Sequence, residues 1–443
     1  MTTTTHLLRR RRFLPLFVTQ LLGAFNDNLF KNAIVFFMVY SVFDSDKDEA
    51  SFSAIASALF ILPFFVLSAL AGQLADMRDK ARIIRWVKAL EIVIMTVGAA
   101  GLLLAWQGIA VHLVAMPLMM LALFGMGVHS TFFGPIKYAI LPQHLQSSEV
   151  LAGTGLVEAG TYLAILAGTI LAGWIPVQWA AGGVVVTALI GYWASLSVPS
   201  APPVIEAEPL DFHIIRASVT LVRNTMQDRR VFLAIAAISF FWTVGAVLFI
   251  EFPPLSKRVL SASKEVASLF LVIFSIGVAL GSLSINALLK GRVSARYSPV
   301  CVLVMGAFVV AFEQVCSHFT PLSGGHLMSV REFLGQPLTP WLLASLGGIA
   351  ISGGMFVVPL YAFLTTCVDK SQTARTIAAN NVVNSGAMVI GAMVAVGLGA
   401  MGVAIIQQLL LAAAMCLISA WLGWRLYCAE RTFGGGAGTP PSN

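Results

Sequence analysis

Long apolar runs, each bounded by a short polar segment, recur from one end of the chain to the other. Each is long enough to cross a hydrocarbon core of roughly 30 Å as a helix of about 20 residues. Continuous runs, rather than short segments of alternating polarity, favour helices over membrane strands. The runs lie near residues 13–43, 53–74, 87–107, 111–133, 155–174, 179–198, 231–252, 266–289, 298–318, 341–364, 377–400 and 402–426. The pattern predicts an all-α integral membrane protein with 12 transmembrane helices in two sets of six.

A polar interruption at 199–230 separates the two sets. Within it, apolar residues at helical spacing stand beside arginines (Ile215, Val219, Val222 and Met226, with Arg216, Arg223 and Arg229). This predicts an amphipathic helix that lies either on the membrane surface or in solvent. The expected division is an N-terminal six-helix bundle at 1–198, a cytoplasmic linker at 199–230, a C-terminal six-helix bundle at 231–426 and a cytoplasmic tail at 427–443.

The two halves resemble each other in sequence. Residues 152–160 (AGTGLVEAG) align with residues 378–386 (AANNVVNSG), and GPIKYA at 134–139 aligns with VPLYA at 358–362. Repeats in equivalent positions of two halves imply a pseudo-two-fold axis along the membrane normal. We therefore expect two pseudo-symmetric six-helix bundles, an arrangement that suits one half rocking against the other.

Composition supports a membrane location. Only 11% of the residues are charged and 58% are hydrophobic, whereas a soluble domain is about a quarter charged. The net charge of +7 does not indicate nucleic-acid binding, because most of the 27 Lys and Arg residues, Lys88 among them, fall on one side of the predicted spans. By the positive-inside rule, that side is the cytoplasm, and both termini face it.

Catalytic and metal-binding residue patterns are not evident in the sequence. No nucleophile–base pair, metal-ligand cluster or phosphate-binding loop is evident, and the five cysteines lack a CxxC spacing. We therefore expect neither an enzyme nor a cofactor nor a metal site.

The loop between the second and third spans reads GQLADMRDKAR over residues 72–82. It resembles the G-x-x-x-D-[RK]-x-G-[RK]-[RK] signature of the major facilitator superfamily, which latches the two halves in the outward-facing state; it departs from it at Asp79, where Gly is usual. An ordinary basic cytoplasmic loop is the alternative. The resemblance implies gating roles for Gly72, Asp76, Arg78, Lys80 and Arg82.

Polar side chains inside the spans are candidates for the substrate site, because a charge there costs at least ~2.5 kcal/mol. Asp27 and Lys31 lie four apart on one helical face and could simply pair with each other, whereas Lys137 could reach the headgroups instead. Glu91 is read as isolated in its span, and it could be solvated or paired without a transport role. The candidate substrate-binding set is Asp27, Asn28, Lys31, Lys137, Glu158, Asn380 and Asn384.

Three segments sharpen the resemblance: GAFNDN at 23–28, GPIKY at 134–138 and GLVEA at 155–159. Together they resemble the bacterial lysophospholipid transporter group of that superfamily, which is related to the transporter part of transporter–acyltransferase fusions. The resemblance implies transport of lysophosphatidylethanolamine-like lipids to the cytoplasmic leaflet of the bacterial inner membrane by alternating access. It places Asp27, Lys137 and Glu158 on the substrate route, and it implies a cytoplasmic acyltransferase acting in trans as a candidate partner.

Two other functions stay open at this point. A proton-coupled exporter of drugs or small metabolites would use the same fold, with Asp27 or Glu158 as the proton carrier. A non-transporting membrane scaffold for a lipid-modifying enzyme would depend on the 199–230 linker rather than on charges within the spans.

Overall fold

The structure, a computed structural model, describes residues 6–42, 46–203, 213–321 and 326–434. In this part of the chain the backbone is almost wholly helical, and the one β-bridge joins Ala262 and Met328. Parts of the predicted linker (204–212) and tail (435–443) lie outside the described residues.

Twelve long helices correspond to the predicted apolar runs within the described ranges. The first half contains α2 (Leu14–Ser41), α3 (Asp46–Met77), α4 (Lys80–Trp106), α5 (Met116–Ala139), α7 (Ser147–Trp174) and α8 (Val177–Leu196). The second half contains α10 (Arg229–Pro254), α11 (Lys264–Leu289), α12 (Ser298–Ser317), α14 (Thr339–Thr366), α15 (Thr373–Ala400) and α16 (Ile405–Gly434). Short helical segments lie between them: η1 (Val111–Ala115), α6 (Leu141–His144), α9 (Ile214–Thr225), η2 (Leu255–Val259) and α13 (Val330–Leu334).

Eleven of the long helices in the described residues are apolar enough to cross a membrane by composition. The exception is α2, which has 28 residues but carries a polar patch from Asn26 to Asn32 that lowers its mean hydropathy. Polar groups inside a span are retained where they serve a function, so α2 is the first helix in which to look for a site.

Local sequence explains where several helices begin. The side chain of Asp79 caps α4 by accepting a hydrogen bond from the backbone N–H of Ala81. At the start of α7, Gln146 and Glu149 form a capping box, and Glu149 also binds Arg12 through two 2.7 Å contacts. Such caps satisfy the backbone N–H groups that the first turn leaves unpaired.

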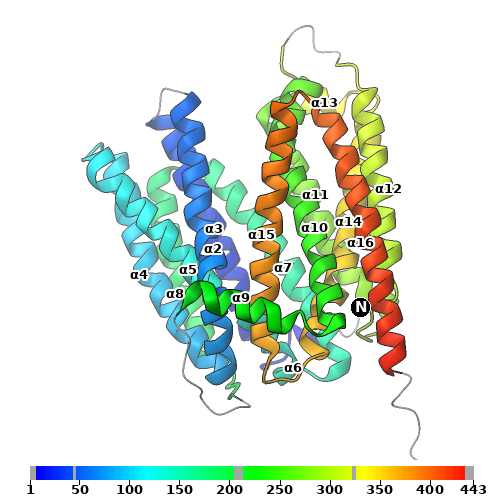
Figure 1. The fold of residues 1–443 in the computed structure, drawn as a ribbon. Coiled ribbons are helices and arrows are strands. Elements are labelled where there is room, and N and C mark those ends of the chain that lie inside the picture. The colour runs from blue at the N-terminus through cyan, green and yellow to red at the C-terminus, as the bar shows by residue number, and fades with distance from the viewer. Residues whose placement is uncertain (1–5, 43–45, 204–212, 322–325, 435–443) are drawn as a thin grey trace, which may run out of the picture. The chain divides into compact units, whose positions relative to one another are not determined.

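The chain forms two compact units (Figure 1). The first unit consists of Met1–Asn224 together with Val368–Val382, and the second consists of Thr225–Cys367 together with Val383–Asn443. The division therefore falls within α15, whose first turns pack with the first unit.

Helix packing repeats from one unit to the other. In the described part of the first unit, five helix pairs are closely packed: α2 with α7, α3 with α5, α4 with α5, α4 with α8, and α2 with α8. Four of these pairs have closely packed equivalents in the second unit: α11 with α14, α12 with α14, α12 with α16, and α10 with α16. The equivalent of α2 with α7, which is α10 with α15, is not closely packed in the described residues. The repeated pattern is what the sequence repeat predicts.

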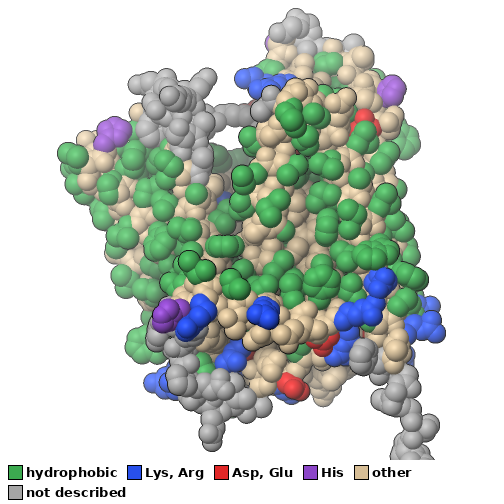
Figure 2. Space-filling model, viewed as in Figure 1, with side chains coloured by type: hydrophobic (Ala, Val, Ile, Leu, Met, Phe, Trp, Pro, Cys, Tyr) green, Lys and Arg blue, Asp and Glu red, His purple; other side chains and the backbone are tan. Residues whose placement is uncertain are grey.

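The surface of the second unit suits a lipid environment. Over α10, α15 and α16 it is covered mainly by hydrophobic side chains, and Lys and Arg side chains gather toward the end at which α16 ends (Figure 2). In the first unit, α9 lies across the spanning helices rather than along them (Figure 1). It buries Ala217 and Leu221 and exposes Ile215 and Val219. Both predicted positions, on the membrane surface or in solvent, stay predictions.

Candidate functional site

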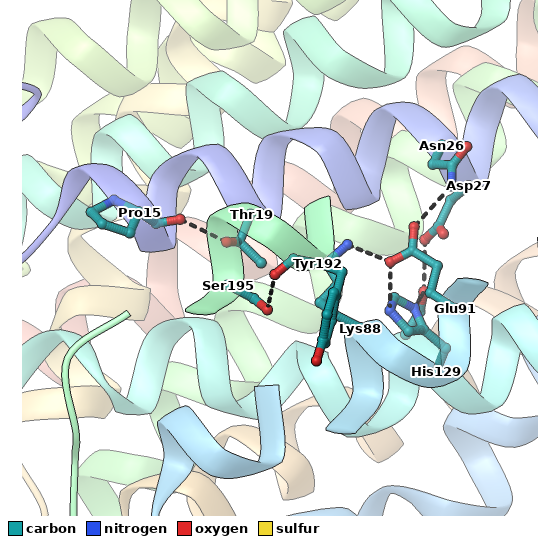
Figure 3. A network of polar contacts seen from close by, with 10 residues as sticks. Pro15, Thr19, Asn26, Asp27, Lys88, Glu91, His129, Tyr192 and Ser195 are labelled. Atoms are coloured by element: carbon teal, nitrogen blue, oxygen red, sulfur yellow. Dashed lines mark hydrogen bonds and ion pairs between the residues drawn. The ribbon is translucent and has the colours of Figure 1, made fainter. Parts of the chain in front are cut away.

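Glu91 of α4 lies at the centre of a buried polar network in the first unit (Figure 3). One of its carboxylate oxygens accepts a 2.8 Å hydrogen bond from Asn26 of α2. The other lies 2.5 Å from the ammonium of Lys88 and 3.1 Å from Nε2 of His129 on α5. We call these four residues the Glu91 network; all four are fully or almost fully buried.

The sequence interpretation of Lys88 and Glu91 was wrong. Lys88 was counted among the cytoplasmic cations and Glu91 was read as isolated, yet the two form an ion pair with no exposed side-chain surface. Glycines make room for the ammonium, since a Cβ atom on Gly23 would lie only 2.9 Å from Lys88 Nζ. Their i, i+3 spacing was the available sequence signal, but His129 gave none because it stands alone in an apolar run.

Asp27 points toward the same region of α5 (Figure 3). Its Oδ2 accepts a 2.6 Å hydrogen bond from Ser130, while its buried Oδ1 has no hydrogen-bond partner among the described residues. Ser130 Oγ lies 3.5 Å from Nδ1 of His129. Asp27 is therefore joined through Ser130 and His129 to the Glu91 network.

The Asp27–Lys31 ion pair that the sequence left possible is not formed in the described structure. Lys31 interacts with Asp27 electrostatically, but its ammonium lies over the ring of Phe60 on α3, 5.7 Å from the ring centre. Asn28 donates to the carbonyl of Ala24 in its own helix. Asp27 and Lys31 therefore do not neutralise each other through a direct ion pair. Each charge is only partly offset by the groups beside it.

Lys137 and Glu158 form a second cluster in the same unit. The hydroxyl of Tyr138 donates a hydrogen bond to Glu158, and the Lys137 ammonium lies 5.0 Å from the centre of the Tyr138 ring. Lys137 also interacts electrostatically with both Glu158 and Asp27. Glu158 is almost completely buried, so Tyr138 and Lys137 compensate a charge that lipid could not.

The two asparagine candidates on α15 belong to different units. Asn380 lies in the first unit and is fully buried. Asn384 lies in the second, where its Oδ1 accepts a 2.7 Å hydrogen bond from Ser239 and its Nδ2 lies 3.5 Å from the hydroxyl of Tyr361. Trp242 also donates to that hydroxyl, at 3.0 Å. We call Ser239, Trp242, Tyr361 and Asn384 the Asn384 cluster.

The loop after α3 contacts the first turn of α15. Asp76 accepts 3.0 Å hydrogen bonds from the backbone N–H groups of Ala374 and Arg375. A Cβ atom on Gly72 would lie 2.7 Å from Cβ of Ala378, so only glycine permits this approach. A carboxylate at a helix N-terminus is favoured by the helix dipole.

The other residues proposed for gating differ in exposure. Arg78 and Arg82 are exposed. Lys80 is fully buried, and its ammonium has no hydrogen-bond partner in the described ranges.

Asp79, which replaces the usual Gly of the signature, ties the loop to the start of the 199–230 segment. It accepts hydrogen bonds from the hydroxyl of Ser200 and the backbone N–H of Ala201. Burial raises the pKa of Asp79, but these hydrogen bonds and the one from Ala81 outweigh burial and hold the pKa below its ordinary value of 3.8. The ionised form is therefore the one that stabilises this loop.

Comparisons with known proteins agree with the fold. Two relatives of similar score are the lysophospholipid transporter LplT of Yersinia pestis (strain Pestoides F) and that of Yersinia pseudotuberculosis serotype O:3 (strain YPIII). Each is 24% identical over 365 residues, which cover 81% of this chain and 79% of the relative.

Solved structures share the fold at low sequence identity. A bacterial homologue of the iron transporter ferroportin, in the outward-facing state, has a TM-score of 0.69 at 11% identity, covering 96% of this chain and all of that one (100%). The human organic anion transporter MFSD10 has a TM-score of 0.68 at 13% identity, covering 94% of this chain and 99% of that one.

The family model of the Major Facilitator Superfamily matches residues 16–392, which is well over half of the chain. That match agrees with the helical fold, the apolar spans and the loop signature at 72–82. The predicted fold class is confirmed, and the chain belongs to the major facilitator superfamily of membrane transporters.

Proposed function

We propose that this transporter carries lysophosphatidylethanolamine-like lipids across the bacterial inner membrane to the cytoplasmic leaflet by alternating access. The observation that carries the proposal is that Asp27 and Lys31 on α2 both lack a direct partner of opposite charge among the described residues. Asp27 keeps a buried carboxylate oxygen without a hydrogen-bond partner in the described structure. Lys31 keeps an ammonium that an aromatic ring, not a carboxylate, faces.

A zwitterionic head group has the complementary chemistry. Its ammonium needs an anion, which Asp27 supplies, and its phosphate needs a cation, which Lys31 or Lys137 supplies. Glu158 and the asparagines Asn28, Asn380 and Asn384 would provide further hydrogen bonds along the route. Similarity to lysophospholipid transporters over most of both chains supports the same substrate class.

Alternating access would use the contact between Asp76 and the start of α15. Because this contact joins the loop at 72–82 to a helix from the other half of the sequence, it can form in one state and open in another. Both termini would lie in the cytoplasm, where an acyltransferase acting in trans would use the delivered lipid.

Purified protein in liposomes tests the proposal. Labelled lysophosphatidylethanolamine is added to one leaflet, and the fraction that albumin can no longer extract is followed over time. We expect protein-dependent protection of the label, lost in Asp27→Asn and kept in Asp369→Asn, whose carboxylate lies on an exposed residue outside the spans. Equal protection in protein-free liposomes would reject the proposal.

A second candidate function is proton-coupled export of a drug or small metabolite. Three titratable groups, Asp27, His129 and Glu91, are linked with the hydroxyl of Ser130 between Asp27 and His129. This arrangement favours proton-coupled export, because such a chain can hold and pass a proton. Transport that follows an imposed pH gradient would support this candidate, and lipid movement without a gradient would count against it.

A further inference from the structure

An apolar groove lies in the second unit between α10, α15 and α16. Its volume is about 500 Å³, within the range of roughly 300–1,000 Å³ typical of small-molecule sites. Its walls include Phe232 and Ala236 of α10, Ala387 and Ile390 of α15, and Leu411 and Ala412 of α16. Figure 1 labels the three helices, and all the residues that line the groove belong to the second unit.

The groove exists where the two units differ in packing. In the first unit α2 and α7 are among the most closely packed helices, and a Cβ atom on Gly160 of α7 would lie 2.8 Å from the ring of Phe17 on α2. The sequence-equivalent pair is α10 and α15. The residue that aligns with Gly160 is Gly386, and a Cβ atom there would meet nothing within 4 Å.

The helices α10 and α15 touch at only a few places in the described structure. Ser239 donates to Asn384, and a Cβ atom on Gly391 would lie 2.3 Å from Cγ2 of Thr243. Glycine in membrane helices usually permits close helix contact. Here the face of α15 beside α10 carries small residues, and the space next to Gly386 is open to another molecule.

The dimensions suit one hydrocarbon chain. From Phe232 to Val247, both of which line the groove, α10 rises about 23 Å at about 1.5 Å per residue. One leaflet of a ~30 Å hydrocarbon core is roughly 15 Å thick. Ile390 and Leu411 are exposed, so the groove is open along one side, and a chain can enter from the bilayer.

Polar groups stand beside this apolar wall. Ser239 lines the groove and donates to Asn384, which connects the groove to the Asn384 cluster with Tyr361 and Trp242. An apolar slot next to a small hydrogen-bonding cluster matches an amphiphile, in which a hydrocarbon chain is joined to a polar head.

We propose that the groove between α10, α15 and α16 binds the acyl chain of a single-chain phospholipid during transport, with the Asn384 cluster beside the glycerol end. This inference rests on the proposed function. Because lipid tails are as apolar as the groove, burial of hydrocarbon alone gives the chain little preference for it. Selection must come from the fit of one chain and from the adjoining polar groups.

The test uses the full-length protein in liposomes and a lysophosphatidylethanolamine with a diazirine in its acyl chain. After illumination, labelled positions are mapped by peptide mass spectrometry. We expect label on the lining residues of α10, α15 and α16, displaced by unlabelled lysophosphatidylethanolamine and not by diacyl phosphatidylethanolamine. Label at other positions would overturn the proposal. Equal displacement by the diacyl lipid would also overturn it, because the groove would then be a site for ordinary bilayer lipid.

Two variants of α15 sharpen the test. Ala387→Trp fills the groove, whereas Val396→Trp adds the same side chain at an exposed position that does not line it. We expect loss of groove labelling and of lysophospholipid transport in Ala387→Trp, with both kept in Val396→Trp. Equal labelling in the two variants, each shown to be folded by its unfolding temperature, would contradict the proposal.

The two proposals fail in different ways. If the wild-type protein transports lysophospholipid and Ala387→Trp transports it as well as Val396→Trp does, the groove assignment is wrong and the function stands. If the wild-type protein transports none and the displaceable label still maps to the groove, the proposed function fails and the groove stands only as a binding site for a single-chain phospholipid.

Discussion

Asp76, at the end of α3, accepts a 3.0 Å hydrogen bond from the backbone N–H of Ala374 in the first turn of α15. The two residues are far apart in sequence and belong to opposite halves of the repeat, yet both lie in the first compact unit. The same carboxylate accepts a second bond from the backbone N–H of Arg375. A single side chain therefore holds the start of α15.

Replacing Asp76 tests this contact. In Asp76→Ala the two backbone N–H groups lose a charged acceptor, and hydrogen bonds to charged groups contribute roughly 1.5–3 kcal/mol each. We expect faster amide exchange over 368–382 and slower transport, followed by hydrogen-exchange mass spectrometry. Asp369→Ala, at an exposed position of the same segment, is the control, and unchanged exchange in Asp76→Ala would contradict the role of Asp76.

The Glu91 network should be sensitive to removal of one partner. Glu91→Gln leaves the buried Lys88 ammonium without its 2.5 Å counter-ion, and breaking a buried pair in this way costs about 3–5 kcal/mol. We expect a clear fall in the unfolding temperature in detergent. The double variant Lys88→Met, Glu91→Gln removes the orphaned charge and should recover much of the loss. A double variant less stable than Glu91→Gln would show that the ion pair does not explain the effect.

Close approach of α11 and α14 requires Gly281. A Cβ atom there would lie 2.0 Å from the carbonyl oxygen of Ile351, so the backbone of one helix must move. We expect Gly281→Ala to destabilise the protein by roughly 1–3 kcal/mol. At Gly245 of α10 a Cβ atom meets nothing within 4 Å, so Gly245→Ala should be neutral or slightly stabilising. Thermal unfolding compares the two, and equal unfolding temperatures would refute the packing argument.

Asp79 makes the stability of the loop after α3 depend on pH. Asp79→Gly restores the usual residue of the signature but removes the α4 cap and the bonds from Ser200 and Ala201. Replacing an Asp cap by Gly costs only a few tenths of a kcal/mol, so most of the expected loss comes from the bonds to Ser200 and Ala201.

Because the folded-state pKa of Asp79 lies below its ordinary value of 3.8, the stabilisation by the ionised group is complete above that value. It is lost as the pH falls through the folded-state pKa. The stability difference between wild type and Asp79→Gly should therefore be constant near neutral pH and shrink in acid. A difference that grows in acid would show the opposite linkage.

The candidate substrate-site carboxylates Asp27 and Glu158 should affect transport more than folding. Asp27→Asn keeps the shape of the side chain and an oxygen that can accept the hydrogen bond from Ser130. It removes the negative charge that would bind the ammonium of the substrate. Glu158→Gln does the same beside Tyr138 and Lys137. We expect each to slow lysophospholipid transport with little change in unfolding temperature. Wild-type rates in both variants would remove the two residues from the substrate route.

The sequence was sufficient to predict the spanning helices, because the length of an apolar run is a local property and the thickness of the hydrocarbon core sets the length that is needed. All twelve predicted runs are helices in the described structure. Individual boundaries were less predictable. Helix α4 begins at Lys80, well before the apolar run at 87–107, since Asp79 caps it there. Lys88 is therefore two turns inside the helix rather than in the cytoplasmic loop.

The site could be predicted only in part, because burial of a charge depends on neighbours from other helices. Asp27 and Lys31 lie at pairing distance in sequence, yet Asp27 bonds to Ser130 of α5 and Lys31 faces Phe60 of α3. His129 gives no signal until Glu91 is placed beside it. The groove in the second unit is also invisible in sequence, since it arises from a packing difference between helices that the repeat makes equivalent.

The central claim is lysophospholipid transport, and uptake tests it most directly. Cells that lack their own transporter but contain an acyltransferase are given labelled lysophosphatidylethanolamine, with and without this protein. The account predicts protein-dependent appearance of the labelled diacyl lipid in the inner leaflet. No uptake, with the protein folded and inserted in the membrane, would contradict the account and favour the exporter.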